Sequence, residues 1–320
     1  MRLVHLTDPH LSSLNGVGFS ELLGKRLSGY LSWRKNRSKH FLPAVLEKLV
    51  TAVVAENPDQ ILLTGDLVQI GLESEIRQAA DWLAILSPPE KVMLVPGNHD
   101  VYARGSAATV SRLWSDYLFQ TAAPARDGNL ADRYPVVRRL GKIDLIGLST
   151  ACVTPVFMAT GSLGNDQLNR LELLLHKSMD EGRMAVLLIH HPPLPGLSSR
   201  RKALTDDGAL EDVLNRYPPA MVFYGHMHRN QELQLGETRV YCTAAASSVS
   251  DASYRVIDIA ERGDGWSFSM QLKTLNLDNH GEPTFVTIDE QSWESGPALT
   301  QVPTAFTSSG IFPIPPGDTT

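Results

Sequence analysis

Five short groups of polar residues along the chain contain side chains that can bind metal ions. They read TDPH, TGDL, PGNHD, HHPP and YGHMH, and they hold six of the ten histidines. Each group follows an apolar run that predicts a β-strand, and the carboxyl ends of strands are where α/β sheets build their sites. The metal-capable side chains in these groups are Asp8, His10, Asp66, Asn98, His99, Asp100, His190, His226 and His228.

Carboxylates, an amide oxygen and imidazoles together suit borderline to hard divalent ions such as Mn²⁺, Fe²⁺ or Zn²⁺. Because no thiolate is among them, a closed structural zinc site is disfavoured. The ligands are numerous enough for two ions, which can share one carboxylate and hold a bridging hydroxide. Such a hydroxide attacks phosphorus in line while the ions neutralise the phosphoryl oxygens, so the pattern predicts a phosphoesterase.

Each group alone also has a purely structural interpretation. Glycines in TGDL and PGNHD permit tight turns, and Pro192 and Pro193 end a strand. The occurrence of all five groups in this order, each after an apolar strand, favours one binding site over five unrelated turns.

The elements that position these groups alternate between short apolar runs and longer amphipathic stretches, as in a layered α/β fold. The predicted strands span residues 2–7, 60–64, 91–95, 134–140, 143–149, 185–189, 220–224, 240–244, 254–259 and 266–275. The predicted helices, with apolar residues at three- and four-residue spacing, span residues 42–56, 73–86, 107–119, 166–179 and 207–216. Within residues 134–149 and 240–275 strands follow one another without a helix, which indicates antiparallel pairing. We therefore expect an α/β fold, a four-layer αββα sandwich of two mixed β-sheets flanked by helices.

Composition limits the class of protein. A chain of 320 residues with 42% hydrophobic residues can bury a large core, and its net charge of −6 argues against general nucleic-acid binding. Cys152 and Cys242 cannot form a disulfide framework, and no 18 apolar residues run together. The N-terminus reaches Asp8 before any stretch of signal-peptide length. These features predict a cytoplasmic protein.

We expect one domain over residues 1–290, followed over residues 291–320 by a flexible tail rich in Pro, Ser and Thr. Inside the domain, residues 19–40 form a basic amphipathic insertion directly after the first polar group. The apolar residues Leu23, Leu27, Tyr30 and Leu31 share a helical face, although Gly29 weakens the helix. The basic residues of the insertion, with no acidic residue between them, are Lys25, Arg26, Arg34, Lys35, Arg37 and Lys39. Such a segment can lie on an anionic membrane, grip a phosphorylated substrate, or simply cap the core.

The five groups resemble the ordered signature DxH, GD, GNH(D/E), HxP and GHxH of the calcineurin-like metallophosphoesterase superfamily, over about residues 1–275. The resemblance implies the metallo-dependent phosphatase fold and two divalent metal ions per chain, Mn²⁺, Fe²⁺ or Fe³⁺, or Zn²⁺. One ion would be held by Asp8, His10, Asp66 and His228, and the other by Asp66, Asn98, His190 and His226, with Asp66 bridging them. His99 would stabilise charge on the phosphate or protonate the leaving oxygen, with Asp100 orienting it. His191 occupies the variable position of HxP and is not assigned as a ligand.

Within the superfamily, the sequence is most similar to the bacterial cyclic nucleotide phosphodiesterase and glycerophosphodiesterase (class III phosphodiesterase) group. That group shares the short DxH start, the HHPP form, and a stretch like Gly161-Ser162-Leu163 through Gln167-Leu168. Gln69 is a departure, because many relatives have a further acidic residue after GD. The insertion is loosely similar to that of lipid-processing members such as the UDP-diacylglucosamine pyrophosphatases.

Three functions follow from these residues. The leading one is a binuclear metal-dependent phosphodiesterase that hydrolyses a cyclic nucleotide or a glycerophosphodiester-like substrate by attack of a metal-bridging hydroxide. The second is a peripheral enzyme at the inner membrane face, acting on a phospholipid or a lipid-linked pyrophosphate and contacting anionic lipid through residues 19–40. The third is a metal-free binding or scaffold protein, which the complete ligand set disfavours. A DNA nuclease ranks low because no added DNA-binding module is present, and a homo-oligomer stays open.

Overall fold

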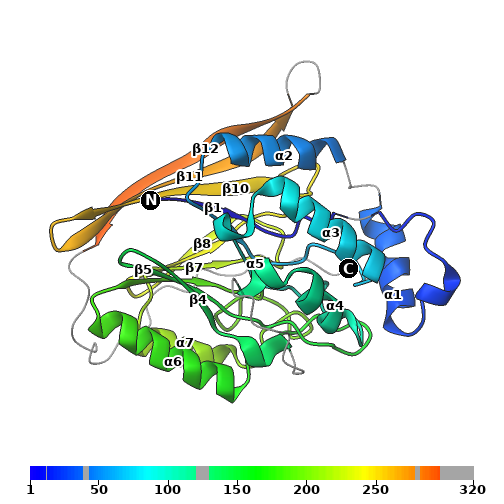
Figure 1. Cartoon of the computed structure of the whole chain (residues 1–320), viewed down its shortest axis with the longest axis horizontal. Coiled ribbons are helices and arrows are strands. Elements are labelled where there is room, and N and C mark those ends of the chain that lie inside the picture. Colours follow the sequence, from blue (N-terminus) through cyan, green and yellow to red (C-terminus); the bar gives the residue numbers. More distant parts are fainter. Residues whose placement is uncertain (12, 39–42, 120–129, 278–281, 296–320) are drawn as a thin grey trace.

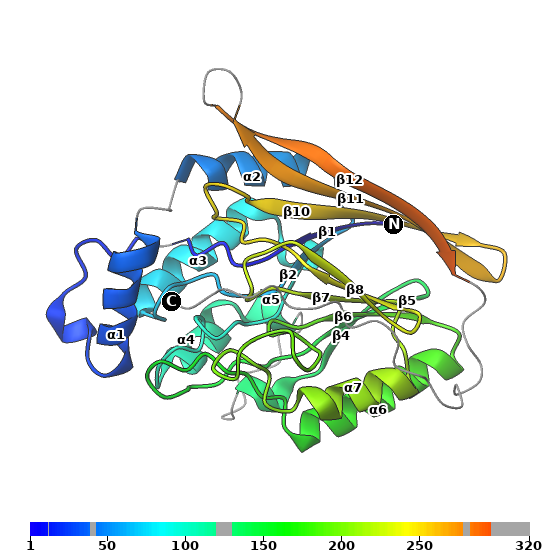
Figure 2. The same cartoon turned by 180° about the vertical axis from the view of Figure 1, so that it is seen from behind.

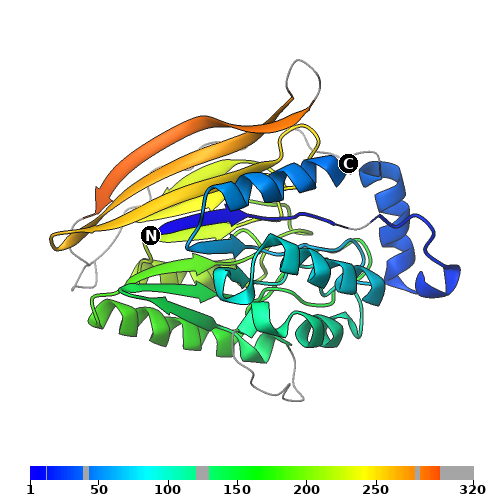
Figure 3. The same cartoon turned by 45° about the horizontal axis from the view of Figure 1, so that its top comes forward.

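The apolar runs of the sequence form two six-stranded sheets that face each other, with helices on their outer sides (Figures 1 and 3). The computed structural model describes residues 1–11, 13–38, 43–119, 130–277 and 282–295. It confirms the predicted α/β architecture of two mixed sheets between helical layers.

The first sheet has its parallel strands at one edge and a long antiparallel extension at the other. In spatial order its strands are β12 (Pro283–Ser295), β11 (Gly265–Leu277), β10 (Ser253–Arg262), β1 (Arg2–Leu6), β2 (Gln60–Leu63) and β3 (Val92–Leu94). The pairs β1–β2 and β2–β3 are parallel, whereas β1–β10, β10–β11 and β11–β12 are antiparallel.

The second sheet has a parallel centre with an antiparallel strand at each edge. Its spatial order is β4 (Val136–Leu140), β5 (Ile143–Gly147), β6 (Met184–Leu188), β7 (Met221–Tyr224), β9 (Thr238–Cys242) and β8 (Gln231–Leu235). Strands β5, β6, β7 and β9 run parallel to one another, and β4 and β8 run antiparallel to their neighbours. Strands β5, β6 and β7 are buried at every residue, which explains why their sequences are continuous apolar runs.

Helices cover the outer face of each sheet (Figures 1 and 2). On the first sheet, α2 (Pro43–Ala55) and α3 (Glu73–Leu86) pack through one apolar cluster, which also joins the facing surfaces of the two sheets. Helices α4 (Ser106–Leu113) and α5 (Ser115–Phe119) follow at the β3 edge. A second cluster lies beneath α6 (Asn165–Asp180) and α7 (Asp207–Arg216) on the second sheet. In the described parts of the chain, no helix is both long and apolar enough to cross a membrane.

The insertion after β1 forms its own helical segment at one end of the molecule (Figures 1 and 2). It contains a 3₁₀ turn at Phe19–Glu21, helix α1 (Lys25–Ser32) and a π-helical turn at Trp33–Arg37. Further 3₁₀ turns lie at Pro89–Lys91 and Leu130–Arg133. Residues 39–42, which include Lys39 and the end of the predicted insertion, lie outside the described residues.

The structure corrects three predictions about elements. The helix predicted over residues 107–119 is two helices, because the backbone of Trp114 leaves the helical conformation between α4 and α5. Strands β8 and β12 were not predicted, because polar residues alternate along both of them and most side chains are at least partly exposed. The domain boundary predicted at residue 290 is too early, since β12 pairs with β11 through Ser295. Backbone hydrogen bonds to β11 can hold such a strand even when its side chains are polar. Residues 296–320 lie outside the described part of the chain.

A buried arginine joins the two sheets. Arg255 of β10 is 0% exposed, and its guanidinium donates to Glu232 Oε1 of β8 at 2.6 Å and to the carbonyl of Cys242 in β9 at 3.1 Å. The guanidinium itself is buried, and its bond to the Cys242 carbonyl is buried too, so its loss would leave that carbonyl and one Glu232 oxygen without this donor.

We expect Arg255→Ala to lower the free energy of unfolding by about 3 kcal/mol, because it breaks a largely buried ion pair and opens a cavity. Urea denaturation measures the change. The matched control is Arg262→Ala, which removes an exposed arginine from the end of the same strand and should change stability by less than about 0.5 kcal/mol. Equal stabilities of the two variants would contradict this role of Arg255.

Candidate metal centre

All seven predicted ligands lie at the carboxyl ends of parallel strands, where the edges of the two sheets meet. Asp8 and His10 follow β1, Asp66 follows β2, and Asn98 follows β3 in the first sheet. The second sheet supplies the other three, with His190 after β6 and His226 and His228 after β7. The fold therefore brings together residues that are more than two hundred positions apart.

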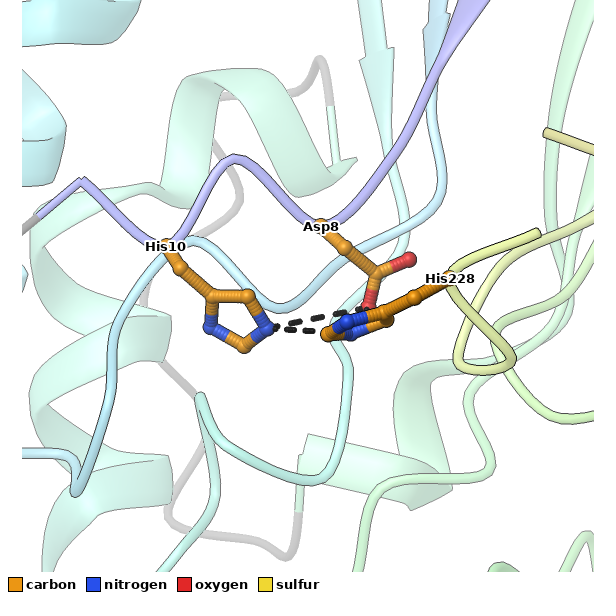
Figure 4. Close-up of side chains that lie close together, drawn as sticks. All are labelled: Asp8, His10 and His228. Carbon is orange, nitrogen blue, oxygen red and sulfur yellow. Dashed lines mark hydrogen bonds and ion pairs between the residues drawn. The ribbon is translucent and has the colours of Figure 1, made fainter. Parts of the chain in front are cut away.

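Asp8, His10 and His228 form the first group of ligands (Figure 4). The Nε2 atom of His228 lies 3.2 Å from Asp8 Oδ1 and 3.3 Å from His10 Nε2. His10 Nε2 lies 4.0 Å from the same Asp8 oxygen. Asp8 is fully buried whereas His228 is exposed, so the centre opens to solvent on the side of His228.

Asp66, His190 and His226 form the second group, and Asn98 joins it. His190 Nε2 lies 3.3 Å from Asp66 Oδ2 and 3.2 Å from Asn98 Oδ1. The two groups are adjacent, because the other oxygen of Asp8 accepts a hydrogen bond from the backbone N–H of His226 at 2.9 Å.

Two buried polar atoms in these groups make no hydrogen bond, namely His226 Nε2 and Asp8 Oδ1, the latter approached by the ring nitrogens of His228 and His10 as ion-pair contacts. Buried polar atoms without partners are rare in folded proteins because each costs free energy. In addition, the Nδ1 atoms of His10 and His190 contact the backbone carbonyls of Val68 at 3.0 Å and Thr64 at 2.6 Å. An N–H at Nδ1 leaves the Nε2 lone pair directed at the centre, as in metal-binding histidines. The residues therefore fit two divalent cations.

The electrostatics agree with a cation site. Burial alone would raise the pKa of Asp66, but the imidazoles of His190 and His99 hold that pKa well below its usual range. Burial alone would lower the pKa of His190, but the Asp66 carboxylate raises it to about 9. Burial, reinforced by His191 and His190, lowers the pKa of His226 well below its usual value. Asp66 and His226 are thus held in the forms that bind a cation.

The ligands are held in unusual backbone conformations. Seven described residues other than glycine have positive φ, and five of them are ligands of the two groups: Asp8, His10, Asp66, His226 and His228, with φ between 42° and 67°. This conformation costs an L-residue about 1–2 kcal/mol, so surrounding contacts must maintain it. Backbone strain of this kind concentrates at functional sites.

Glycines in the polar groups allow the loops to approach one another more closely than any side chain would permit. A Cβ atom on Gly97 would overlap the carboxylate and backbone nitrogen of Asp66, and one on Gly225 would overlap Thr7 and Asp8. The turn interpretation of Gly97 is therefore incomplete, since Gly97 and Gly225 create space for two ligand carboxylates.

Asp100, expected from the family resemblance to orient His99, contacts through its carboxylate backbone groups of the loops that carry the ligands and His99. Its fully buried carboxylate accepts backbone N–H groups of Asp66 at 2.9 Å, Leu67 at 2.8 Å and Gly97 at 2.8 Å, so it fastens two ligand-bearing loops together. Burial and the nearby Asp66 raise the pKa of Asp100 to about 7. The carboxylate faces these loops because their N–H donors converge on it. Asp100 therefore positions the loops that carry the ligands.

His99 is oriented by other contacts. Its Nδ1 makes a short hydrogen bond to the carbonyl of Gln69, and its ring stacks on Tyr102 with centroids 5.6 Å apart. Its Nε2 lies 4.0 Å from Asp66 Oδ2, at the partly exposed edge of the centre. Gln69 and Tyr102 were not predicted as site residues, since Gln69 is marked only as a departure from the family pattern after GD and no motif marks Tyr102.

Two further residues near the centre have supporting roles. Buried Glu75 accepts the backbone N–H groups of Gln69, Ile70 and Leu72, which holds the loop after Asp66. Glu75 is the third residue of α3, the position at which a glutamate side chain reaches back to the backbone before the helix. Both ring nitrogens of His191 contact other residues, Thr150 at 2.7 Å and the carbonyl of Ala159 at 3.1 Å, in agreement with its omission from the ligands.

The insertion packs on the core mainly through residues outside the apolar face of Leu23, Leu27, Tyr30 and Leu31, of which only Tyr30 packs against the buried cluster. Leu22, Gly29 and Trp33 are buried together with Ile70 and Tyr102. The predicted apolar face is mostly in solvent, with Leu23 77%, Leu27 46% and Leu31 55% exposed, and Phe19 is 90% exposed. Helical spacing shows which residues share a face but not which face is buried.

Two of the basic residues in the insertion turn toward the loops of the centre. The guanidinium of Arg26 donates to the carbonyls of Ile70 at 3.3 Å and Gly71 at 2.7 Å, and Lys25 contacts the loop around Thr154. Arg34 and Lys35 are exposed. The insertion is therefore both a cap on the core and an exposed basic, apolar surface.

The sequence matches one protein family and resembles individual proteins of known name. The model of the calcineurin-like phosphoesterase family matches residues 1–230. A probable cyclic nucleotide phosphodiesterase of Vesicomyosocius okutanii is 26% identical over 205 residues, which is 63% of this chain and 76% of that protein. The glycerophosphodiester phosphodiesterase GpdQ of Enterobacter lignolyticus is 26% identical over 231 residues, 71% of each chain.

Solved structures share the fold. A dimetal phosphatase from Danio rerio has a TM-score of 0.57 at 15% identity, covering 90% of this chain and 98% of its own. A purple acid phosphatase from yellow lupin has a TM-score of 0.52 at 14% identity, covering 91% of this chain and 53% of its own.

We expect Gly97→Ala to weaken Mn²⁺ binding by about tenfold to a hundredfold, because the added methyl group would displace the Asp66 carboxylate. A loss of this size is typical when a group that orients a metal ligand is changed. Isothermal titration calorimetry measures the affinity. Gly208→Ala is the matched control, since a Cβ atom there meets nothing within 4 Å. Unchanged binding by the Gly97 variant would show that the close approach of the loops is dispensable.

Proposed function

The chain belongs to the calcineurin-like phosphoesterase family, and from this premise we propose that it is a phosphodiesterase that depends on two divalent metal ions. Its substrate class is a cyclic nucleotide or a glycerophosphodiester-like compound. The observation that carries this proposal is the pair of adjacent ligand groups, each with a buried atom that lacks a hydrogen-bond partner. The relatives named cyclic nucleotide phosphodiesterase and glycerophosphodiester phosphodiesterase support the choice of a diester.

The two ions are assigned to the two ligand groups. One ion would be held by Asp8, His10 and His228, and the other by Asp66, His190 and His226 together with Asn98, and the family resemblance implies that Asp66 would serve both. When bound, ions such as Mn²⁺, Fe²⁺ or Zn²⁺ would supply the attacking hydroxide and neutralise charge on the phosphoryl oxygens.

His99 is the candidate acid for the leaving oxygen. Its Nδ1 is engaged by the carbonyl of Gln69, so a proton on Nε2 would face the centre near Asp66. A positioned imidazole of this kind can donate a proton to the leaving group as the bond to phosphorus breaks. Asp100 contributes by holding the loop that carries His99.

We expect Asp66→Ala and His190→Ala each to reduce Mn²⁺-dependent hydrolysis of bis(p-nitrophenyl) phosphate by a factor of about a thousand or more, because each removes charge stabilisation from the transition state. The release of p-nitrophenolate is the readout. His176→Ala and Asp180→Ala remove an exposed His–Asp pair from α6 and serve as controls of the same residue types.

Two outcomes would contradict this proposal. If wild-type protein reloaded with Mn²⁺ binds both ions but hydrolyses no phosphoester, the hydrolase assignment is wrong. Metal analysis that finds fewer than one ion per chain under saturating Mn²⁺ would instead favour a metal-free binding protein.

The outer face of the insertion favours a second candidate function. In this function the protein is a peripheral enzyme on the inner membrane face that acts on a phospholipid or lipid-linked pyrophosphate. Phe19, Leu23, Leu27 and Leu31 are spaced four residues apart and are all at least 46% exposed. Exposed Arg34 follows them in the next turn of the helix. Apolar side chains bordered by cationic ones match the interface of an anionic bilayer.

We expect wild-type protein to sediment with vesicles of phosphatidylcholine and phosphatidylglycerol but not with phosphatidylcholine alone. Replacing Leu23, Leu27 and Leu31 by serine should reduce the bound fraction at least tenfold, because about 0.8 kcal/mol is lost for each CH₂ group that no longer enters the bilayer. Ile85→Ser combined with Leu173→Ser removes two exposed apolar residues elsewhere and should have no effect. Wild-type protein that stays in the supernatant with both vesicle types would rule this function out.

A further inference from the structure

Lys25, the first residue of α1, places a partly buried ammonium group beside the metal centre. Its Nζ donates to Thr154 Oγ1 at 2.6 Å and contacts the carbonyl of Met158 at 3.3 Å. The same nitrogen lies 4.4 Å from the centroid of the Tyr102 ring, in the range of a cation–π interaction. Because Tyr102 also stacks on His99, the ammonium and the His99 ring both contact this one aromatic ring.

The lysine is fixed relative to the centre on two sides. On one side, Gly29 of the same helix is so close to Tyr102 that a Cβ atom there would overlap the tyrosine hydroxyl at 2.5 Å. On the other, Thr154 and Met158 lie in a loop that contacts His191, the neighbour of the ligand His190, through Thr150 and Ala159. Lys25 is therefore held in place, unlike a lysine that moves freely in solvent.

The ammonium of Lys25 has no carboxylate within 4 Å among the described residues, and its hydrogen bonds go to a hydroxyl and a carbonyl. In contrast, the partly buried Lys273 forms an ion pair with Glu56. Burial of a cation without a counter-charge is unfavourable, and it lowers the pKa of Lys25. An anion bound at this position would offset that cost, and the third N–H of the ammonium can donate to it.

We propose that Lys25 is a specificity-determining residue that binds a second anionic group of the substrate, a phosphate or carboxylate other than the scissile phosphodiester. This inference rests on the proposed function, because it places the reacting phosphoryl group at the metal ligands and His99. The scissile group already has the ions and His99 to balance its charge. Lys25 contacts the tyrosine ring on which His99 stacks, so we place it beside a substituent on the alcohol of the diester.

The test uses two substrates that differ only in one anionic group. They are thymidine 5′-(p-nitrophenyl phosphate) and the same compound with a 3′-phosphate, assayed with Mn²⁺-loaded protein. We expect wild-type protein to prefer the 3′-phosphorylated compound in kcat/KM, mainly through KM. In Lys25→Met this preference should fall by about tenfold or more, the loss typical of a hydrogen bond to a charged group. Lys25→Arg keeps the charge and should recover most of the preference.

Lys35→Met removes an exposed lysine of the same insertion and controls for a general change in charge. A purely structural role of Lys25 would reduce kcat/KM for both compounds by the same factor, and Lys25→Arg would not restore a preference. Either that result, or a wild-type protein without preference, would overturn the inference. Failure of wild-type protein to hydrolyse either compound would instead count against the proposed phosphodiesterase function.

Discussion

Burial of two carboxylates is the constraint on which the rest of this structure depends. An isolated carboxylate withdrawn from water costs several kcal/mol, and Asp8 and Asp66 are both almost fully buried where the sheets meet. The chain offsets part of this cost, since one oxygen of each accepts a backbone N–H, from His226 and His99 respectively. The remaining negative charge faces a cluster of imidazoles, and divalent ions complete the balance.

The scaffold holds these groups in a geometry that they would not adopt alone. Parallel strands of two sheets end at the same edge, and their loops interlock through Asp100 and through the missing side chains of Gly97 and Gly225. Arg255 joins the sheets behind the centre. Small displacements of either sheet would therefore move ligands on both, so the precision of the site is a property of the whole sandwich.

The sequence was sufficient to predict what depends on local pattern. The two sheets with their flanking helices followed from apolar runs and periodicity, and all seven predicted ligands lie together because their motifs end parallel strands. Properties decided by tertiary contacts were missed. Strand β12 forms by pairing with β11 although many of its side chains are polar and exposed, and helical spacing could not decide between the open alternatives of burial and exposure for Leu23 and Leu27. The actual partners of Asp100 are backbone groups, which carry no residue-specific signal.

The left-handed backbone at five ligand positions also restricts how the centre can change during evolution. Among residues with a side chain, Asp, Asn and His are the ones that tolerate this conformation best, and they occupy all five positions. Glu or Cys would provide metal-binding atoms too, but each would bear a larger conformational penalty before any ion was bound. The backbone of these loops therefore disfavours replacement of the ligands by cysteine, and with it a change to a thiolate-rich metal site.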